Sequence, residues 1–490
     1  MHFEPVIGLE VHVQLKTNTK IFCRCSTKFG AAPNSQVCPV CLGLPGVLPV
    51  LNERVVEFAT HLALATQCHI NETSVLARKN YFYPDLPKAY QISQFEEPFC
   101  EHGAITIHVE GQAPQKIGIT RIHMEEDAGK SLHAESFVAK NETLIDLNRC
   151  GTPLLEIVSE PDFRSAREAC EYLVKLRQIV VYLGICDGNM EEGSLRCDAN
   201  VSVRPLGEAK LGTKTELKNM NSFRAVEKAI EYEIHRQEMV LENGGKIEQQ
   251  TMLWDANRNV AEAMRSKEYS HDYRYFPDPD LVPIQIARDY IEAVARRMPE
   301  LPDAKRHRFQ SFFGLPEYDA AVLTETPDLA TYFEKVAEDV NDKKLASNWV
   351  MGHVLRALKD HNDSIHTFPV TPRYLAEILQ LLETKSISTN SAKIVFDECF
   401  RTGYDPKNIV EKQKLALITD DKKIDQAIDQ VLDSNARDVQ DYLGGKAKVF
   451  GFLMGQVMRA TQGKAHPQTV QQALRAKLDA LKNEKSTEGS

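Results

Sequence analysis

The sequence predicts an α+β fold, with an antiparallel sheet in the N-terminal part followed by two all-α parts. Up to about residue 290, short stretches alternate apolar and polar residues with the period of two that half-buried strands show. After Pro299 and Pro302 the apolar residues recur mainly at helical spacing. A chain of 490 residues is too long for one ordinary core. We therefore expect three domains, at 1–293, 294–408 and 409–490.

The first domain should contain two well-defined helices, at 165–184 and 222–242. The first begins with a Ser-x-x-Glu capping box and ends at a Gly, and the second stops at a pair of Gly residues. In the C-terminal half, residues 328–361 and 372–384 have the pattern of amphipathic helices. The Asp405-Pro406 pair indicates a second joint, with further helices beyond it.

The composition is typical of a soluble globular protein, with 42% hydrophobic and 26% charged residues. No apolar run approaches the roughly 18 residues that span a bilayer, and the opening residues lack the basic stretch and apolar core of a signal peptide. We therefore expect a cytoplasmic protein with no membrane partner. The formal net charge of -10 argues against a basic coat, so any nucleic-acid contact must be local.

Four predicted strands carry metal-capable groups on one face. In chain order, their polar residues are Glu10, His12 and Gln14; Arg121, His123 and Glu125; Arg196, Asp198, Asn200, Ser202 and Arg204; and Lys214, Glu216 and Lys218. For a single strand, an ordinary solvated face explains such a pattern. Four together favour a site, because clustered like charges are destabilising unless a cation compensates them. Carboxylates with one imidazole suit Mg²⁺ or Mn²⁺ holding phosphates, and nearby Arg and Lys would bind phosphate oxygens.

Common nucleotide-binding loops are not found. Residues 128–131 end like a Walker A loop, but Met124 stands where its first Gly is required. No Gly-x-Gly-x-x-Gly fingerprint opens a helix. If ATP binds, a carboxylate-lined sheet must hold it through a metal ion.

The loop at 78–91 joins basic residues to aromatic ones, among them Tyr81 and Tyr83, with two prolines. Such a run can stack a purine or a terminal adenosine. A hydrophobic loop packed on the core is an equally good interpretation, and residues 271–280 allow the same two interpretations.

Four of the eleven cysteines are clustered, as Cys23, Cys25, Cys38 and Cys41. Paired cysteines at this spacing predict a zinc site, because they bring four thiolates into a tetrahedron. A Cys₄ site leaves no position for substrate, so its role should be structural. The other seven cysteines are expected to be small buried hydrophobes.

The C-terminal segment 443–490 has eight basic residues against three acidic ones. Lys446, Lys448, Arg459 and Lys464 are therefore candidates for phosphate contact, although a solvated helix face is the more common explanation. Gly451 and Gly455 would share a helix face, and we expect that face to pack closely against a neighbouring helix.

The chain resembles the B subunits of aspartyl/glutamyl-tRNA(Asn/Gln) amidotransferases along essentially its whole length. The resemblance lies in long, specific motifs at Val6–Val13, Arg78–Gln94, Arg121–Ser131, Gly151–Pro161, Met190–Asn200 and Asp272–Pro283. It implies an N-terminal cradle domain related to the glutamine synthetase fold, a helical domain and a small tRNA-binding tail. It also implies two partners in one complex: an amidase that frees ammonia from glutamine, and a small third protein that bridges the two.

The activity implied by the resemblance is ATP-dependent phosphorylation of the side-chain carboxylate of mischarged Glu-tRNA(Gln) or Asp-tRNA(Asn), followed by amidation with ammonia. The family's metal ligands match Glu10, His12, Glu125 and Glu216, with Asp198 a further candidate. Lys79 and Arg196 are candidates for phosphate or carboxylate contact. The cysteines match a zinc site that only part of the family has.

Two other functions stay open at this stage. A free-standing ligase for a small acid would need neither the long helical C-terminus nor the basic tail. A non-catalytic tRNA-binding scaffold would use the cysteine cluster and the tail, but a pure binder of polyanions would not line a groove with carboxylates.

Overall fold

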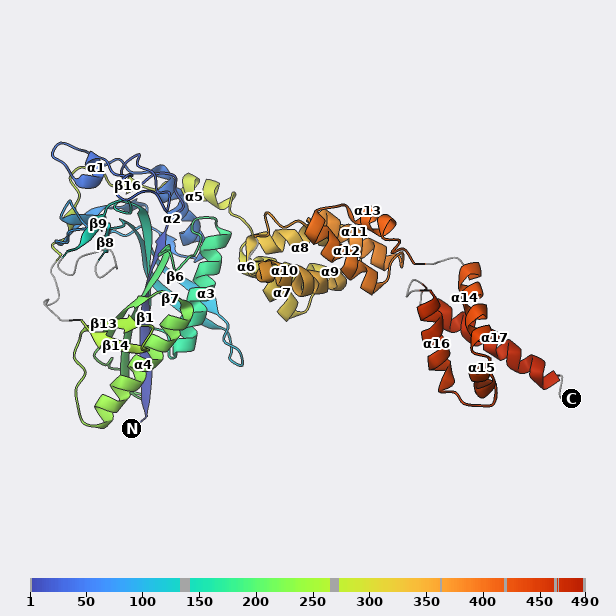
Figure 1. Ribbon diagram of the computed structural model, residues 1–490. Helices are drawn as coiled ribbons and strands as arrows, with labels where there is room; N and C mark the ends of the chain where they lie inside the picture. Colours follow the sequence, from blue (N-terminus) through green and yellow to red (C-terminus); the bar gives the residue numbers. More distant parts are fainter. Residues whose placement is uncertain are drawn as a thin grey trace. The chain divides into compact units, whose positions relative to one another are not determined.

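The computed structural model describes residues 2–132, 142–264, 273–361, 364–417, 421–461, 465 and 467–487. The chain forms two compact units, residues 1–304 and 305–490, whose elements are labelled in Figure 1. Within the described part, no helix combines the length and apolar character that crossing a membrane requires.

A nine-stranded sheet is the centre of the first unit, as far as the structure describes it. Its order is β14 (Val260–Ala263), β13 (Thr251–Asp255), β12 (Thr215–Met220), β11 (Leu195–Pro205), β1 (Phe3–Gln14), β10 (Pro153–Ser159), β7 (Gln115–Glu126), β6 (Cys100–Ile107) and β2 (His69–Ile70). Strands β12 and β13 pair in parallel, and the other neighbours pair antiparallel. The expected antiparallel sheet is therefore present with one parallel pair, and the fold is α+β.

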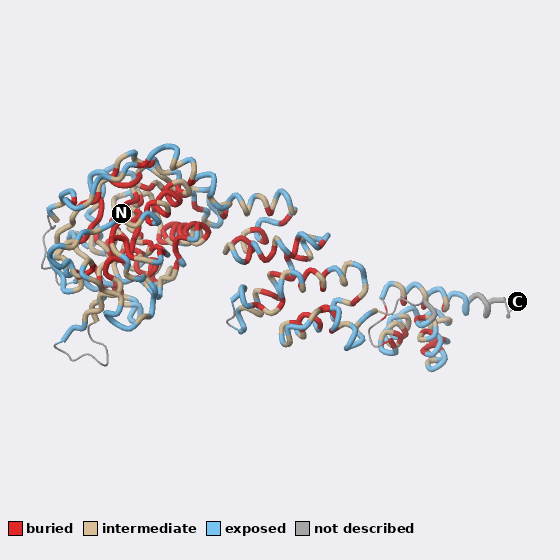
Figure 2. Tube along the Cα trace, turned by 90° about the horizontal axis from the view of Figure 1, so that it is seen from above, coloured by how far each residue is buried: buried red, intermediate tan, exposed pale blue. Residues whose placement is uncertain are grey.

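One face of this sheet is the hydrophobic core. Leu9, Val11 and Val13 of β1 are at most 1% exposed, and the helices α2 (Glu53–Ala65), α3 (Ala166–Tyr182) and α4 (Phe223–Glu242) pack against this sheet. Figure 2 shows the buried residues of this unit in red, gathered in its interior. Burial of the apolar face turns the polar residues of the same strands to the opposite side.

Both helices expected in the first unit are confirmed. The Ser165 hydroxyl accepts a hydrogen bond from the backbone N–H of Glu168 at 3.2 Å, which caps α3, and Gly184 follows the helix with a φ of +68°. Ser222 caps α4 in the same way, through the N–H of Ala225 at 3.1 Å. These caps satisfy backbone donors that a helix start leaves open.

Smaller elements surround the large sheet. A three-stranded sheet consists of β15 (Phe276–Pro277), β4 (Ala77–Asn80) and β5 (Tyr90–Ser93), and two-stranded sheets consist of β16 (Ile284–Gln285) with β3 (Thr73–Ser74) and β8 (Lys130–Leu132) with β9 (Leu144–Asp146). The short helix α1 (Pro39–Leu42) carries Cys41, and α5 (Arg288–Ala295) packs on α2.

In the second unit, the described residues form two separate hydrophobic clusters. The first unites α6 (Pro302–Phe313), α7 (Glu317–Leu323), α8 (Pro327–Asp339), α9 (Lys343–Trp349), the π-helix η1 (Val350–Val354), α10 (Leu355–His361), α11 (Pro372–Glu383), α12 (Thr389–Thr402) and α13 (Pro406–Lys412). The helices expected at 328–361 and 372–384 are therefore present. Ile409 of α13 is buried in this cluster, so its core continues past the Asp405-Pro406 pair.

The last cluster is formed by α14 (Asp421–Ser434), α15 (Ala436–Leu443), α16 (Val449–Ala460) and α17 (Pro467–Thr487). Its core includes Ile428, Leu453 and Leu474. The expectation of close packing at Gly451 and Gly455 is wrong: both are exposed, and a Cβ built on either meets no atom within 4 Å. Leu453 and Val457, on another part of α16, are fully buried and form its contact with the other helices.

Candidate functional site

Four ionisable residues on the polar face of the large sheet form one continuous row. Arg196 of β11 lies opposite His12 of β1, His12 lies opposite Glu156 of β10, and Glu156 lies opposite His123 of β7. Residues directly opposite one another in antiparallel strands project to the same side. Antiparallel pairing thus brings together residues that are far apart in the chain.

Three residues of this row, His12, Glu156 and His123, form a compact cluster with Glu125 of β7, and we call it the histidine–carboxylate cluster. The Nε2 atom of His12 is 3.5 Å from Oε1 of Glu125 and 3.4 Å from Oε2 of Glu156. The Nε2 atom of His123 is 3.2 Å from the same Glu156 oxygen. One nitrogen of His12 and one oxygen from each carboxylate lie within 4.8 Å of one another, close enough to bind one metal ion.

The electrostatics of the cluster are strongly perturbed. Burial alone would lower the pKa of His12, but its hydrogen bond to Glu156 and the charge of Glu125 raise the pKa to about 9. Burial and the charge of Glu156 raise the pKa of Glu125. Burial also acts to raise the pKa of Glu156, but the two imidazoles outweigh it and hold that pKa well below its usual range. Perturbed groups packed in this way are typical of functional sites.

A second acidic group lies on the same face and consists of Glu10, Asp198 and Glu216. Glu10 lies opposite Asp198 in the sheet. The ammonium of Lys218 is 2.8 Å from Asp198 and 3.0 Å from Glu216. We call this set the lysine-bridged acid group. The structure therefore divides the residues expected to share one site: His12 and Glu125 are in the first set, and Glu10, Asp198 and Glu216 are in the second.

Two cations border the histidine–carboxylate cluster. Arg196 donates to Asp127 at 2.9 Å. The ammonium of Lys79 lies 4.9 Å from the ring centre of Tyr273 and 5.9 Å from that of Tyr81. Burial acts to lower the pKa of Lys79, but Tyr275, Glu125 and Glu156 outweigh it, so its pKa is raised and the ammonium stays charged.

The aromatic loop that follows β4 has one anchored and one exposed tyrosine. The Tyr81 hydroxyl donates to Oε1 of Gln91 at 3.1 Å, and its ring packs edge-on against Tyr83 at 5.8 Å. Tyr83 is 55% exposed. The side chain of Phe95, also partly exposed, is stacked in parallel on Tyr275 with ring centres 4.3 Å apart. These rings offer flat apolar surface beside the charged cluster.

Buried nitrogens on the polar face are consistent with a bound ligand. Among the described residues, Arg121 Nε, His123 Nδ1 and Arg196 Nε are buried without a hydrogen-bond partner. Buried polar atoms normally have partners, so such atoms beside a charged cluster favour contact with water or a ligand. The oxygen and imidazole donors of the cluster fit a divalent cation such as Mg²⁺ or Mn²⁺.

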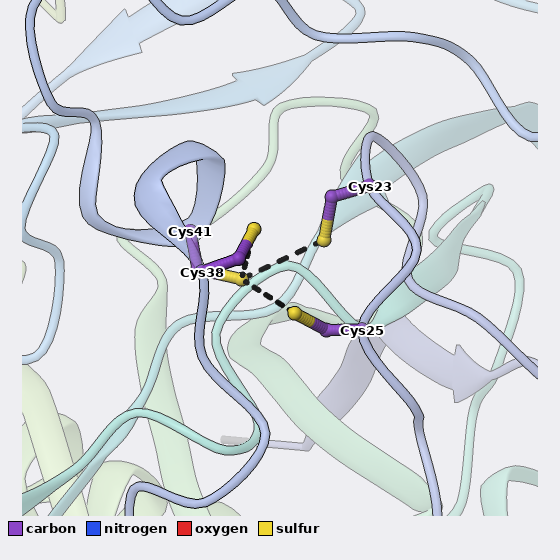
Figure 3. Close-up of side chains that lie close together, drawn as sticks. All are labelled: Cys23, Cys25, Cys38 and Cys41. Carbon is purple, nitrogen blue, oxygen red and sulfur yellow. Dashed lines mark hydrogen bonds between the residues drawn. The ribbon is translucent and has the colours of Figure 1, made fainter.

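The four clustered cysteines converge, as Figure 3 shows. The Sγ atom of Cys41 is 3.6 Å from that of Cys23 and 3.8 Å from those of Cys25 and Cys38. Thiolates around a tetrahedral zinc ion, at Zn–S distances of about 2.3 Å, would lie about 3.8 Å apart. The four sulfurs are therefore arranged as a metal site requires. The buried ammonium of Lys20 lies 3.3 Å from the Cys41 sulfur.

Family comparisons cover most of the chain. A family model described as the GatB/GatE catalytic domain matches residues 5–292, and one described as the GatB domain matches residues 331–478. The chain belongs to the GatB family. Its relatives include proteins named as the B subunit of aspartyl/glutamyl-tRNA(Asn/Gln) amidotransferase. That from Geotalea daltonii is 60% identical over 478 residues, covering 98% of this chain and 100% of the relative.

Other members of the GatB family are similar over the same length. The protein of the same name from Geobacter sulfurreducens is 58% identical, and that from Carboxydothermus hydrogenoformans is 53% identical. Each match covers 98% of this chain and at least 99% of the relative. The similarity therefore includes the sheet, the helical part and the tail.

Two residues of the histidine–carboxylate cluster were not among the ligands predicted for this GatB-family chain. His123 was counted among the metal-capable groups of the polar face but not among the predicted metal ligands. Glu156 was not predicted because it stands within the apolar run of β10, where the alternation is weak. Burying a lone carboxylate in an otherwise apolar strand costs free energy unless it has partners, so a single Glu in such a strand is itself a sign of a site.

The tail residues are only partly placed. Lys446, Lys448 and Arg459 are exposed on or beside α16, and Lys446 is paired with Asp441 at 3.1 Å. Lys464 lies outside the described residues. The exposed cations are accessible to a polyanion, and their contact with tRNA stays a prediction.

Proposed function

We propose that this chain is the carboxylate-activating, tRNA-binding component of a tRNA-dependent amidotransferase, a carbon–nitrogen ligase that uses ATP. Its substrate would be Glu-tRNA(Gln), Asp-tRNA(Asn) or both, mischarged tRNAs converted for translation in the cytoplasm. Full-length similarity to proteins of that name supports the reaction. The observation that carries the proposal within this chain is the histidine–carboxylate cluster, where three strands present two carboxylates and an imidazole to one point.

His12, Glu125 and Glu156 would hold a Mg²⁺ or Mn²⁺ ion. Glu10 and Glu216, expected as ligands of the same ion, belong instead to the separate lysine-bridged acid group. Asp198 belongs to the same group. The ion, when bound with ATP, supplies positive charge to the transferring phosphoryl group. Before the ion binds, Glu156 orients both imidazoles through its contacts at 3.4 and 3.2 Å. Such orientation matters because most of the catalysis in phosphoryl transfer is positioning.

The bordering side chains would bind the substrates. Lys79 and Arg196 carry fixed positive charge at the edge of the cluster and suit phosphate or carboxylate oxygens. Tyr81 and Tyr83 offer ring faces for the adenine of ATP or the terminal adenosine of tRNA. The rings also confine Lys79, which limits the directions in which its ammonium can donate.

The reaction has two steps. An oxygen of the amino-acid carboxylate attacks the γ-phosphorus of ATP, and ADP leaves with the electron pair of the broken P–O bond. Ammonia then attacks the carbon of the acyl phosphate, loses a proton and expels inorganic phosphate, which leaves the amide. Activation is needed because a carboxylate is a poor electrophile toward ammonia.

The four-cysteine site would hold Zn²⁺ in a structural role. Four protein ligands fill a tetrahedral zinc ion and leave no position for substrate. The donor set and the sulfur spacing fit this ion. Lys20 supplies a positive charge beside the thiolates.

The complex would include an amidase that releases ammonia from glutamine and a small third protein that bridges the amidase to this chain. The first unit would serve as the cradle related to glutamine synthetase. Lys446, Lys448 and Arg459 in the tail would bind tRNA phosphates. We also propose that the cradle domain ends at residue 293 and the helical domain at residue 408, followed by the tail.

The test incubates the purified complex with γ-labelled ATP and each mischarged tRNA, and measures phosphate release and amide formation. We expect both products with the wild type, and at least a hundredfold less with Glu125→Gln or His12→Ala, because the first removes a negative charge from the cation site and the second removes a ligand. Binding of the tRNA should stay within about twofold, because its main contacts are elsewhere. Equal loss of tRNA binding in both variants would favour the non-catalytic scaffold instead.

A further inference from the structure

His123 is the second imidazole of the histidine–carboxylate cluster, and it is more deeply buried than His12. The side chain of His123 is 5% exposed, whereas that of His12 is 20% exposed. The two imidazoles come from β7 and β1, and Glu156 of the intervening strand β10 lies opposite both. An ion that approaches the polar face from solvent therefore reaches His12 more easily than His123.

The two imidazoles also contact the carboxylates differently. The Nε2 atom of His12 is 3.5 Å from Glu125 and 3.4 Å from Glu156, and the donor atoms of these three residues lie within 4.8 Å of one another. The Nε2 atom of His123 is 3.2 Å from Glu156 but 4.0 Å from Glu125. His12 thus lies where a cation would contact both carboxylates, while His123 contacts Glu156 from the side.

The second ring nitrogen of His123 shows that packing alone does not explain an imidazole here. An ionised carboxylate only accepts hydrogen bonds, so Nε2 of His123 is the donor to Glu156. The other nitrogen, Nδ1, is buried and has no hydrogen-bond partner among the described residues. Buried polar atoms normally have partners, and an apolar side chain would leave none unpaired. The contact of Nε2 with Glu156 is what the imidazole adds.

We propose that His123 is a positioning residue, which holds Glu156 as a ligand of the divalent cation through a hydrogen bond from Nε2 that persists when the ion is bound. This deepens the proposed function and rests on it. The two imidazoles then have different roles: His12 binds the ion, and His123 orients a carboxylate that binds the ion. A carboxylate already held in place loses less freedom on binding, so the ion binds more tightly.

The test measures binding of Mn²⁺ alone to the zinc-loaded full chain, by electron paramagnetic resonance and without nucleotide. The amide nitrogen of Gln is as many bonds from Cβ as Nε2 of His, so His123→Gln can still donate to Glu156 and should bind Mn²⁺ within about threefold of the wild type. The amide nitrogen of Asn corresponds to Nδ1 instead. His123→Asn therefore loses the contact, as does His123→Leu, and both should bind Mn²⁺ about tenfold more weakly or worse.

His108→Leu is the matched control, because it removes an exposed imidazole just after β6 and should leave the Mn²⁺ affinity unchanged. The second measurement is tRNA-dependent phosphate release by the complex at increasing Mg²⁺. In His123→Asn the Mg²⁺ concentration for half-maximal rate should rise about tenfold, while the rate at saturating Mg²⁺ stays within about threefold of the wild type. A general structural defect would lower the saturated rate.

Two results would overturn the inference and leave the proposed function standing. The first is wild-type Mn²⁺ affinity in His123→Asn, and the second is equal weakening in His123→Gln and His123→Asn, since the hydrogen bond would then make no difference. If His12→Ala binds Mn²⁺ as tightly as the wild type, the proposed cation site itself is wrong, and the inference with it.

Discussion

Lys20 shows how one buried residue can stabilise a metal site. It is 1% exposed, and its ammonium donates to the carbonyl oxygen of Gln36 at 2.8 Å and contacts the Cys41 sulfur at 3.3 Å. A hydrogen bond between the Cys23 and Cys41 thiols and the positive charge of Lys20 together lower the pKa of the Cys41 thiol to about 4. A buried cation beside thiolates compensates their negative charge.

We predict that Lys20→Met accelerates chelator-induced zinc release about tenfold, because the thiolates lose their nearest compensating charge. Lys28→Met is the matched control, since Lys28 is exposed in the same cysteine-rich segment. The release rate is measured with a colour-forming chelator on the zinc-loaded chain. Equal rates in the two variants would show that Lys20 has no such role.

Individual residues also show which parts of the site could be predicted. Period-two alternation placed His12 and Glu125 on the polar face because their neighbours Val11 and Met124 are strongly apolar. The pattern within one strand contains no information on which strands are neighbours. The division between the histidine–carboxylate cluster and the lysine-bridged acid group follows from pairing across strands, so it appears only in the folded chain.

At the scale of elements, the short helix α1 connects the cysteine cluster to the loop before β5. Gly43 ends α1 with a φ of +62°, and a Cβ at this position would lie 2.5 Å from Cγ of Lys88. Lys88 in turn forms an ion pair with Glu126 at the end of β7, and both side chains are nearly buried. The close approach of Gly43 therefore lets the cysteine-bearing segment pack against the sheet.

We predict that Gly43→Ala lowers the thermal midpoint of the first unit more than Gly46→Ala does, by about 2–6 °C, because overpacking costs about 1–3 kcal/mol. Gly46 has an even larger φ of +87° but no atom within 4 Å of a built Cβ, so it controls for backbone strain. Calorimetry of the zinc-loaded chain provides the midpoints. A larger loss in Gly46→Ala would contradict the role of the contact.

Elements were predictable where local signals were strong. Caps and glycines defined α3 and α4, and the helices at 328–361 and 372–384 followed from apolar spacing. The break of the helical segment into α8, α9, η1 and α10 depends on tertiary packing and was not visible. The prediction of close packing at Gly451 and Gly455 was wrong because two glycines on one helix face permit close packing but do not cause it.

At the scale of the whole molecule, the sheet and the helical parts contribute different features to the proposed reaction. The sheet of the first unit supplies the charged face, while the second unit adds helical clusters with exposed cations near its C-terminal end. Ile409 packs in the same cluster as α8 and α11, so a boundary at 408 stays a prediction that limited proteolysis can test.

The most direct test of the proposed cation site is X-ray anomalous scattering at the manganese edge, from crystals of the complex grown with Mn²⁺ and a non-hydrolysable ATP analogue. We predict a peak about 2.0–2.5 Å from the imidazole of His12 and from oxygens of Glu125 and Glu156. Absence of a peak at the histidine–carboxylate cluster, with nucleotide bound elsewhere, would contradict the account.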